Sequence, residues 1–387
     1  MFRFDPYSPA TDADPFPFYK RLRDDFPCFW SEEANMWVLS RYDDIVTALN
    51  DWQTYSSAKG NLMDELPNRA GATLGTTDPP RHDRLRNLIQ HAFSKRALDH
   101  LVAPLRASTN AALDAIDGER QFDFVETVSS HVTVDLIFSM LALPPDNRRE
   151  VRDKAVLMVQ SDPATRQKGP EHIAAFQWMA DYARHLVEER QKTPGDDLLS
   201  QFVLAEVDGE RLSEREIQLT VTTLIMAGIE SLSGFLTMMA LNLADHAVAR
   251  RQVVANPALL PDAVEESLRF NTSAQRFRRY VMKDTPLHGQ TMREGDFVCL
   301  CYGSGNRDER QFPNPDVYDI ARKPKGHLGF GGGVHACLGT AIGRLAARLV
   351  FEEFHQRVPS YTRVQEQLPW MPSTTFRSPL RLELGRD

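Results

Sequence analysis

The stretch FGGGVHACLG, from Phe330 to Gly339, decides how the rest of this 387-residue chain is interpreted. A glycine-rich loop leads to Cys337, and a segment with helical spacing follows directly. Oriented backbone N–H groups at a helix N-terminus favour negative charge on a sulfur held there. Three consecutive glycines remove side chains, so the backbone can approach a flat ligand closely. A lone cysteine is usually a small buried hydrophobic residue and a glycine run is usually a turn, so the inference rests on their combination.

Four residues of this stretch stand at defined distances from the cysteine. Phe330 lies seven residues before the cysteine, Gly333 four before, His335 two before and Gly339 two after. The segment resembles the cysteine loop of cytochrome P-450 monooxygenases. The resemblance implies that Cys337 is the thiolate ligand of a heme b iron, that Phe330 covers the proximal side, and that His335 donates to a heme propionate. It also implies a mainly α fold with small β-sheets, forming a single heme domain over residues 1–387.

Composition and charge agree with a globular enzyme. The chain is 42% hydrophobic and 25% charged, enough for a sizeable core, and its formal charge of -8 argues against a nucleic-acid partner. We find no stretch approaching the roughly 20 apolar residues of a membrane span and no signal-peptide core at the N-terminus. Four cysteines without a paired framework suit a reducing compartment. These features predict a cytoplasmic protein without a membrane anchor.

Apolar periodicity predicts mostly helices. Apolar residues at three- and four-residue spacing predict helices over 42–50, 81–93, 95–116, 123–141, 148–160, 171–192 and 212–247. Alternation predicts short strands over 280–282, 285–288 and 297–300, with more in about the last 25 residues. Residues 55–77 lack periodicity and are predicted to form a long loop that covers the site.

The longest predicted helix carries Ala227, Gly228, Ile229, Glu230 and Ser231 in succession. An unpaired buried carboxylate is costly, so two adjacent polar residues in an apolar segment need a reason. The resemblance implies that Ala227 and Gly228 make room beside the heme and that Ile229 faces the substrate pocket. It makes Glu230 and Ser231 the catalytic acid and alcohol that deliver protons. Serine lacks the methyl group that restricts the usual threonine, which predicts a less tightly held proton network.

Further basic residues match heme-propionate donors in the family. His82 and Arg86 lie four apart and share one helical face, which without the heme would be read as a solvated basic helix. The resemblance assigns both residues, with Arg279 and His335, to the propionates, a role that suits the bidentate arginine fork. His327 stands near the cysteine loop and receives no role from the sequence.

Glu266 and Arg269, three apart on a predicted helix, match the family's Glu-x-x-Arg pair. Arg322 matches the usual third member. The resemblance implies that this trio stabilises the fold through charge-assisted hydrogen bonds and takes no part in catalysis.

Substrate contacts are expected from three segments. The resemblance places Ile229 on the central helix, Ala274 and Phe277 after the Glu-x-x-Arg helix, and Thr375 in a C-terminal turn with Thr374 and Phe376. Mostly apolar walls suggest a small hydrophobic or aromatic substrate. Arg276 would be available for a substrate carboxylate only against strand alternation, which turns it away from the pocket.

The expected partners follow from what the sequence lacks. It carries no reductase segment and no flavin or iron–sulfur motif, so the resemblance implies a separate [2Fe–2S] ferredoxin with its flavin-dependent reductase, and O₂ as oxidant. Cations near the cysteine loop predict a basic docking patch whose function weakens with salt; they are Arg322, Lys323, Lys325, Arg344 and Arg348.

Three other functions stay open. A heme-thiolate nitric oxide reductase does not require the acid–alcohol pair, and a peroxide-driven hydroxylase of the same family typically lacks it. A non-enzymatic heme sensor would need a signalling or DNA-binding module, and none is readable in the sequence. Glu230 and Ser231 therefore favour a monooxygenase that hydroxylates or O-demethylates its substrate.

Overall fold

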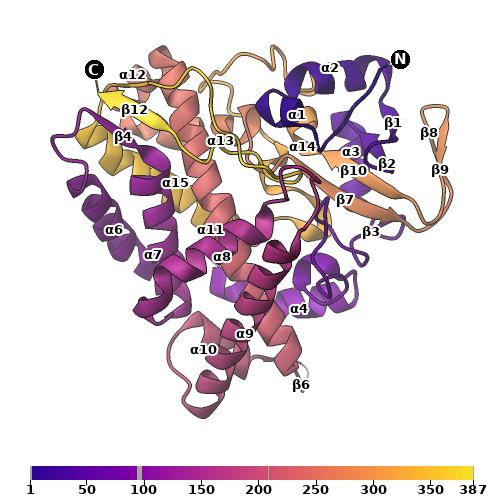
Figure 1. The fold of residues 1–387 in the computed structure, drawn as a ribbon, viewed down its shortest axis with the longest axis horizontal. Helices are drawn as coiled ribbons and strands as arrows, with labels where there is room; N and C mark the ends of the chain where they lie inside the picture. Colours follow the sequence, from indigo (N-terminus) through magenta and orange to yellow (C-terminus); the bar gives the residue numbers. More distant parts are fainter. Residues whose placement is uncertain (1, 94–97, 208, 387) are drawn as a thin grey trace.

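The computed structural model describes residues 2–93, 98–207 and 209–386. Helices form most of the body; the largest sheet lies toward the N-terminal side, and a second sheet lies beside the C-terminus (Figure 1). The helices are α1 Pro9–Ala13, α2 Phe16–Asp25, α3 Tyr42–Asn50, α4 Arg81–Ile89, α6 Val102–Asp114, α7 Ser130–Leu141, α8 Arg148–Val159, α9 Pro170–Lys192, α10 Leu198–Leu204, α11 Glu214–Asp245, α12 Ala247–Ala255, α13 Leu260–Phe270, α14 Tyr302–Gly305 and α15 Thr340–Arg357. The predicted mainly α fold with small sheets is confirmed.

The largest sheet has five strands in the order β1-β2-β10-β7-β3. Its members are β1 Cys28–Ser31, β2 Met36–Leu39, β3 Tyr55–Ser56, β7 Arg276–Val281 and β10 Phe297–Cys301. A second sheet joins β4 Gln121–Asp123, β11 Tyr361–Arg363 and β12 Glu383–Arg386, and two hairpins pair β5 Glu206–Val207 with β6 Glu210–Arg211 and β8 Thr285–Leu287 with β9 Gln290–Met292. The β8–β9 hairpin projects from the body beside the N-terminal strands (Figure 1).

Most predicted helices are present, with shorter ends. The predicted helix over 81–93 is α4 followed by a 3₁₀ turn at Gln90–Phe93. Of the helix predicted over 95–116, residues 95–97 lie outside the described residues, and α6 begins at Val102, so that Pro104 falls in its first turn, where proline is tolerated. The helix predicted over 123–141 instead begins with strand β4 and a π-helical turn, Val125–Ser129, before α7.

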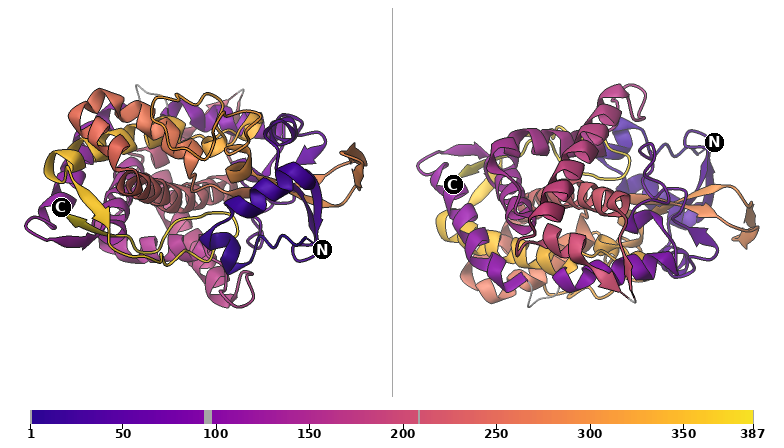
Figure 2. Two further views of the ribbon diagram at one scale, coloured as in Figure 1. Left: turned by 90° about the horizontal axis from the view of Figure 1, so that it is seen from above. Right: turned by 90° about the horizontal axis from the view of Figure 1, so that it is seen from below.

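The central helix α11 organises the body. Ser213 Oγ accepts the N–H of Glu216 at 3.3 Å and Glu216 Oε2 accepts the N–H of Ser213 at 2.9 Å, a capping box that fixes where the helix begins. The helix packs against α7, α8, α9 and α13, and both views of Figure 2 show it enclosed by other helices. The helix α11 is therefore held in place on several sides and can form one wall of a cavity.

One sequence expectation is corrected by α11. By length and composition it could cross a membrane, since its most apolar window has a mean hydropathy of 1.6. The expectation that no stretch approaches a membrane span is therefore wrong. Because 78% of that window is buried inside the fold, the apolar residues are accounted for by the protein core.

A buried ion pair joins α13 to the connection that follows α14. Arg269 donates to Glu266 through Nε at 2.9 Å and Nη2 at 2.7 Å, and both side chains are fully buried. Arg269 Nη1 also donates to the carbonyls of Asn306 and Pro315, while Arg322 Nε donates to Glu266 Oε1 at 3.2 Å. The predicted trio is thus brought together, and its charges satisfy backbone carbonyls of an otherwise irregular segment.

Replacing one member of this trio should be severely destabilising. Glu266→Gln leaves two guanidinium groups without their carboxylate in the core, and we expect a loss of about 3 kcal/mol or more in the free energy of unfolding. Denaturant unfolding followed by circular dichroism measures it. Glu188→Gln, which removes an exposed pair with Arg184 on α9, is the matched control and should cost less than about 1 kcal/mol. Equal losses in the two variants would contradict a special role for the trio.

Candidate functional site

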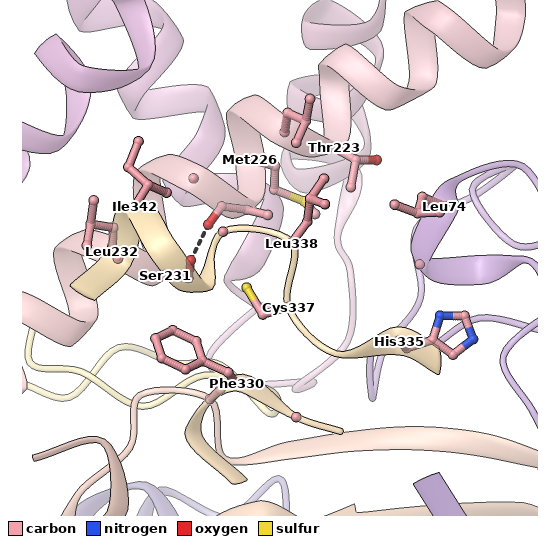
Figure 3. Close-up of a pocket in the computed structure, with 18 of the residues that line it drawn as sticks. Leu74, Thr223, Met226, Ser231, Leu232, Phe330, His335, Cys337, Leu338 and Ile342 are labelled. Carbon is pink, nitrogen blue, oxygen red and sulfur yellow. Dashed lines mark hydrogen bonds between the residues drawn. The ribbon is translucent and has the colours of Figure 1, made fainter. Parts of the chain in front are cut away.

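A cavity of about 340 Å³ lies between α11 and the cysteine loop. Apolar side chains dominate its walls, and Figure 3 shows Leu74, Met226, Leu232, Leu338 and Ile342 around it. Its size and apolar character are those of a site for an organic ligand. The predicted loop over 55–77 contributes to the wall, because Asn61, Leu62, Arg69, Leu74 and Gly75 border the cavity.

Cys337 lies at the junction of the loop and α15, as the sequence predicts. Its N–H donates to the Phe330 carbonyl at 2.9 Å, which closes the loop, and Thr340 Oγ1 donates to the Cys337 carbonyl at 2.7 Å. The side chain is accessible because it borders the cavity (Figure 3). Protein atoms around the sulfur desolvate it and raise the pKa of the thiol, while the Gly339 N–H, the Thr340 hydroxyl, Arg86 and Arg344 oppose that rise. Burial is the larger effect, so the pKa stays above its ordinary value, and the donors and cations on the protein side offset only part of that rise.

The glycine run has a different neighbour from the one that the sequence suggests. Gly333 has φ +62°, and a Cβ there would lie 1.9 Å from the Leu49 carbonyl oxygen at the end of α3. A Cβ on Gly332 would lie 3.3 Å from Leu49 Cδ1, whereas Gly331 borders the cavity with φ +66°. Two of the three glycines thus allow contact with α3, and one faces the ligand space.

Two histidines leave ring nitrogens unsatisfied beside the cavity. The rings of His82 and His335 meet edge to face with centroids 4.6 Å apart. His82 Nε2 and both nitrogens of His335 are buried without a hydrogen-bond partner among the described residues; His335 Nε2 lies 3.8 Å from Asp78 Oδ1, beyond hydrogen-bond distance. Buried polar atoms are nearly always paired, so these nitrogens fit a ligand that brings acceptors, such as the carboxylates of heme.

The two predicted propionate arginines are placed differently. Arg279, on β7, borders the cavity, and its Nη1 donates to the Arg278 carbonyl at 2.8 Å. Arg86, on α4, donates to the Ala336 carbonyl at 2.9 Å and so holds the residue just before the cysteine. Arg279 thus borders the ligand space, whereas Arg86 contacts the loop backbone.

One face of α11 forms the distal wall of the cavity. Thr223, Ala227 and Ser231 border it at four-residue spacing, with Gly228 beside them. A Cβ on Gly228 would lie 2.4 Å from Ile137 Cδ1 on α7, so this glycine permits close helix packing. Ser231 Oγ donates to the Ala227 carbonyl, the bond dashed in Figure 3. The sequence analysis does not single out Thr223 and Met226; Thr223 lies four residues before Ala227, a helical spacing that could have indicated its place on the same face.

Ile229 does not meet the expectation that it faces the cavity. It is buried but does not border the cavity, because each residue turns about 100° around an α-helix and Ile229 lies two residues after Ala227. Glu230 is also off the cavity face. The acid and the alcohol of the predicted pair therefore project from different sides of α11.

Glu230 lies in a buried polar environment behind the cavity wall. Burial raises the pKa of its carboxyl group from 4.5 to about 7, while the charge of Arg152 and a hydrogen bond with Ser378 oppose the rise. Nearby hydroxyls form a further cluster, in which Ser233 Oγ lies 3.2 Å from Ser129 Oγ and 3.3 Å from Ser130 Oγ. Near neutral pH this carboxyl group is poised between its two protonation states.

Strand alternation sorts the remaining substrate candidates. Phe277 and Arg279 border the cavity, whereas Arg276 is fully buried elsewhere and its Nε donates to the Thr374 carbonyl at 2.8 Å. Ala274 and Phe376 border the cavity and form a β-bridge with each other. Thr375 does not border it; its hydroxyl oxygen accepts the N–H of Met63 at 3.2 Å. Of the predicted substrate contacts, the structure thus places Ala274 and Phe277 at the cavity and Thr375 behind its wall.

Asp64 joins three segments beside the cavity. It accepts the hydroxyls of Ser161, from the α8–α9 connection, and of Thr374, from the C-terminal turn, the latter at 2.8 Å. Lys168 Nζ lies 3.7 Å from Asp64 Oδ2 and donates to the Met158 carbonyl at 2.9 Å. Burial lowers the pKa of Lys168, and Asp64 opposes that effect. The loop that contains Leu62 is therefore tied to both of its neighbours.

The predicted basic patch is largely compensated by nearby acids. Lys323 lies 3.6 Å from Asp262, Arg344 binds Glu265, and Arg348 binds Glu352 at 2.8 Å. Arg322 is engaged by Glu266 and backbone carbonyls, as described above. The surface around the cysteine loop is thus a mixture of both charges, which weakens the argument for strong electrostatic steering.

Comparisons with known proteins find similarity to one family over nearly the whole chain. The family model described as Cytochrome P450 matches residues 16–256 and 251–358. Putative cytochrome P450 123 of Mycobacterium tuberculosis (strain ATCC 25618 / H37Rv) is 32% identical over 362 residues, covering 92% of this chain and 90% of that protein. Nocardicin C N-oxygenase of Nocardia uniformis subsp. tsuyamanensis is 31% identical over 393 residues, covering 97% of each. The structure of CYP109E1 from Bacillus megaterium in complex with testosterone superposes with a TM-score of 0.90 at 27% identity, covering 98% of this chain and 100% of that one.

The environment of Glu230 predicts a pH-dependent contribution to stability. Its folded-state pKa is raised, so between about pH 4.5 and 7 the unfolded chain loses a proton that the folded chain keeps, and stability falls as pH rises. Glu230→Gln should remove this trend. Relative to the variant, the wild-type protein should lose on the order of 3 kcal/mol of unfolding free energy from pH 4 to pH 8. Denaturant midpoints of both proteins across this range measure it; parallel curves would refute the assignment.

Proposed function

This chain belongs to the cytochrome P450 family of heme b monooxygenases with a cysteine thiolate ligand, and we propose that it inserts one oxygen atom of O₂ into a C–H bond of a small hydrophobic substrate. The outcome is hydroxylation, or O-demethylation where the attacked carbon belongs to a methoxy group. The observation that carries the proposal is a single accessible thiol at the wall of an apolar cavity. Cys28, Cys299 and Cys301 are buried in the core elsewhere, which supports Cys337 as the proposed ligand.

The heme, when bound, supplies reversible electron uptake and oxygen activation that the side chains lack. Cys337 would hold the iron, and its negative charge increases electron density there. His82, His335 and Arg279 would bind the propionates, a role supported by the unpartnered ring nitrogens and by the placement of Arg279 at the cavity. Arg86 would act beside them while holding the Ala336 carbonyl. Phe330 would cover the sulfur side, and Ala227 would leave space on the opposite face, where Gly228 lets α7 pack closely against α11.

Ser231 and Glu230 would supply protons from two sides of α11. Ser231 presents its hydroxyl at the cavity, where a bound substrate and oxygen would be found. Glu230 can exchange protons near neutral pH because its pKa is raised by burial to about 7. Transfer between the two groups requires the Ser231 hydroxyl to leave the Ala227 carbonyl or to be reached through water.

The substrate class follows from the walls. Ala274, Phe277 and Phe376 join the leucines and Met226 in lining an apolar space, which supports a hydrophobic or aromatic molecule. The similar CYP109E1 structure contains testosterone, so a cavity in this fold accommodates a compact hydrophobic ligand.

Electrons would come from a separate protein, which we propose is a [2Fe–2S] ferredoxin with its flavin-dependent reductase. The sequence carries no flavin or iron–sulfur motif of its own. We also propose a cytoplasmic location, supported by four cysteines that all lack disulfides.

The proposed ligand is tested by Cys337→Ser in the heme-loaded protein. We expect the wild type to give the red-shifted Soret band of a thiolate-ligated ferrous–carbon monoxide complex, and the variant to lose that band together with product formation from O₂ and reductant. Cys28→Ser, another cysteine replacement, is the control and should keep both. A thiolate band that survives in Cys337→Ser would disprove the ligand; product formed from hydrogen peroxide alone, but not from O₂ with a ferredoxin system, would replace the proposed reaction by peroxide-driven hydroxylation.

The role of Ser231 is tested by the ratio of product formed to electrons consumed. Ser231→Ala removes the hydroxyl at the cavity and should lower that ratio by about tenfold or more, because proton delivery is impaired. Ser233→Ala is the matched control, since Ser233 is bonded to Ser129 and Ser130 and does not border the cavity. An unchanged ratio in Ser231→Ala, or an equal loss in the control, would count against the assignment.

A further inference from the structure

Glu265 links α13 to both ends of the segment that carries the proposed heme ligand. Its Oε1 accepts Arg344 Nε at 2.5 Å and its Oε2 accepts Arg344 Nη2 at 2.8 Å, so the carboxylate and the guanidinium meet at two points. His327 Nε2 lies 3.0 Å from Glu265 Oε2. Arg344 belongs to α15, after the cysteine, and His327 precedes the loop. We call Glu265, Arg344 and His327 the proximal bracket.

The protonation of His327 follows from its two neighbours. Its Nδ1 accepts the backbone N–H of Gly329 at 3.1 Å, so that nitrogen carries no hydrogen. The remaining hydrogen is then on Nε2, which donates it to Glu265. The imidazole is nearly buried, and its hydrogen bond orients the carboxylate. Burial alone would raise the pKa of Glu265, but the hydrogen bonds from Arg344 and His327 lower it to about 2, so the carboxylate is ionised.

The bracket lies directly behind Phe330. Arg344 Cζ stands 4.9 Å from the centre of the Phe330 ring, and the His327 ring centroid is 6.1 Å from it. Arg344 and Cys337 also influence one another electrostatically, since the sulfur raises the pKa of Arg344 and Arg344 lowers that of Cys337. One fixed positive and one fixed negative charge are therefore held on the sulfur side of the cavity.

We propose that Glu265 and Arg344, oriented by His327, are positioning residues that set the reduction potential of the iron bound through Cys337; this rests on the proposed function. Adding an electron to the iron is favoured by a nearby positive charge and opposed by a negative one. Arg344 therefore favours reduction of the iron and Glu265 opposes it. Their two-point contact fixes the positions of the two charges relative to each other.

The test is a spectroelectrochemical titration of the purified, heme-loaded protein without substrate. Glu265→Gln keeps the side-chain length and one acceptor oxygen but removes the negative charge, so the potential should become more positive. Arg344→Gln should make it more negative, and the double variant should return toward the wild type. His327→Leu leaves both charges in place and should shift the potential less than either charge variant.

Arg348→Gln is the matched control. Arg348 lies one turn later on α15 and pairs with Glu352 at 2.8 Å, so the same change of net charge should leave the potential unmoved. Single-charge variants that do not shift the potential, that shift it in the same direction, or that behave like Arg348→Gln would overturn the proposal. A wild-type protein without a thiolate-type carbon monoxide spectrum would overturn the proposed function as well, whereas a normal spectrum with unmoved potentials would overturn the bracket alone.

Discussion

The N–H of Cys337 donates to the carbonyl of Phe330, and the loop closed by this bond has to satisfy two neighbours at once. On one side Gly333 is pressed against the last turn of α3, where a Cβ would overlap the Leu49 carbonyl oxygen. On the other side the sulfur borders an apolar cavity. Because the loop leads directly into α15, the same backbone that shapes it also supplies the Gly339 N–H to the sulfur. The position of the Cys337 sulfur thus depends on packing between α3, α15 and the cysteine loop.

The opposite wall of the cavity depends on the rotation of α11. Residues at four-residue spacing bring Thr223, Ala227 and Ser231 to the cavity, and the intervening Glu230 is turned into a polar layer behind the helix. This division separates two requirements that conflict chemically. The cavity stays apolar enough for a hydrophobic ligand, while an ionisable group with a raised pKa lies within one turn of the Ser231 hydroxyl.

Features that depend on residues close together in the chain, such as the helices, could be predicted from the spacing of apolar residues. The length and place of α11 follow from its spacing alone, whereas the role of the cysteine loop and the position of Phe277 at the cavity come from the resemblance; the structure agrees with the helix and with the placement of Phe277. The resemblance predicts Ile229 at the cavity, whereas the 100° turn per residue of an α-helix puts it on a different face from Ala227.

Contacts between distant segments carried no such signal. The His82–His335 pair and the Asp64 contacts join residues more than 90 positions apart, and Glu265 meets residues 62 and 79 positions away. The glycine run was visible, but its partner on α3 was not, because the tertiary packing that selects it has no periodicity in the sequence. The contact of His327 with Glu265 depends on the tertiary fold, so no pattern in the sequence indicated it.

Iron K-edge X-ray absorption of the ferric, heme-loaded protein tests the central claim most directly, because it detects the atom bound to the metal. We expect one sulfur neighbour of the iron in the wild type, retained when Cys28, Cys299 or Cys301 is replaced by serine and lost in Cys337→Ser. A wild-type spectrum without sulfur scattering, or one that keeps it after Cys337 is replaced, would contradict the account.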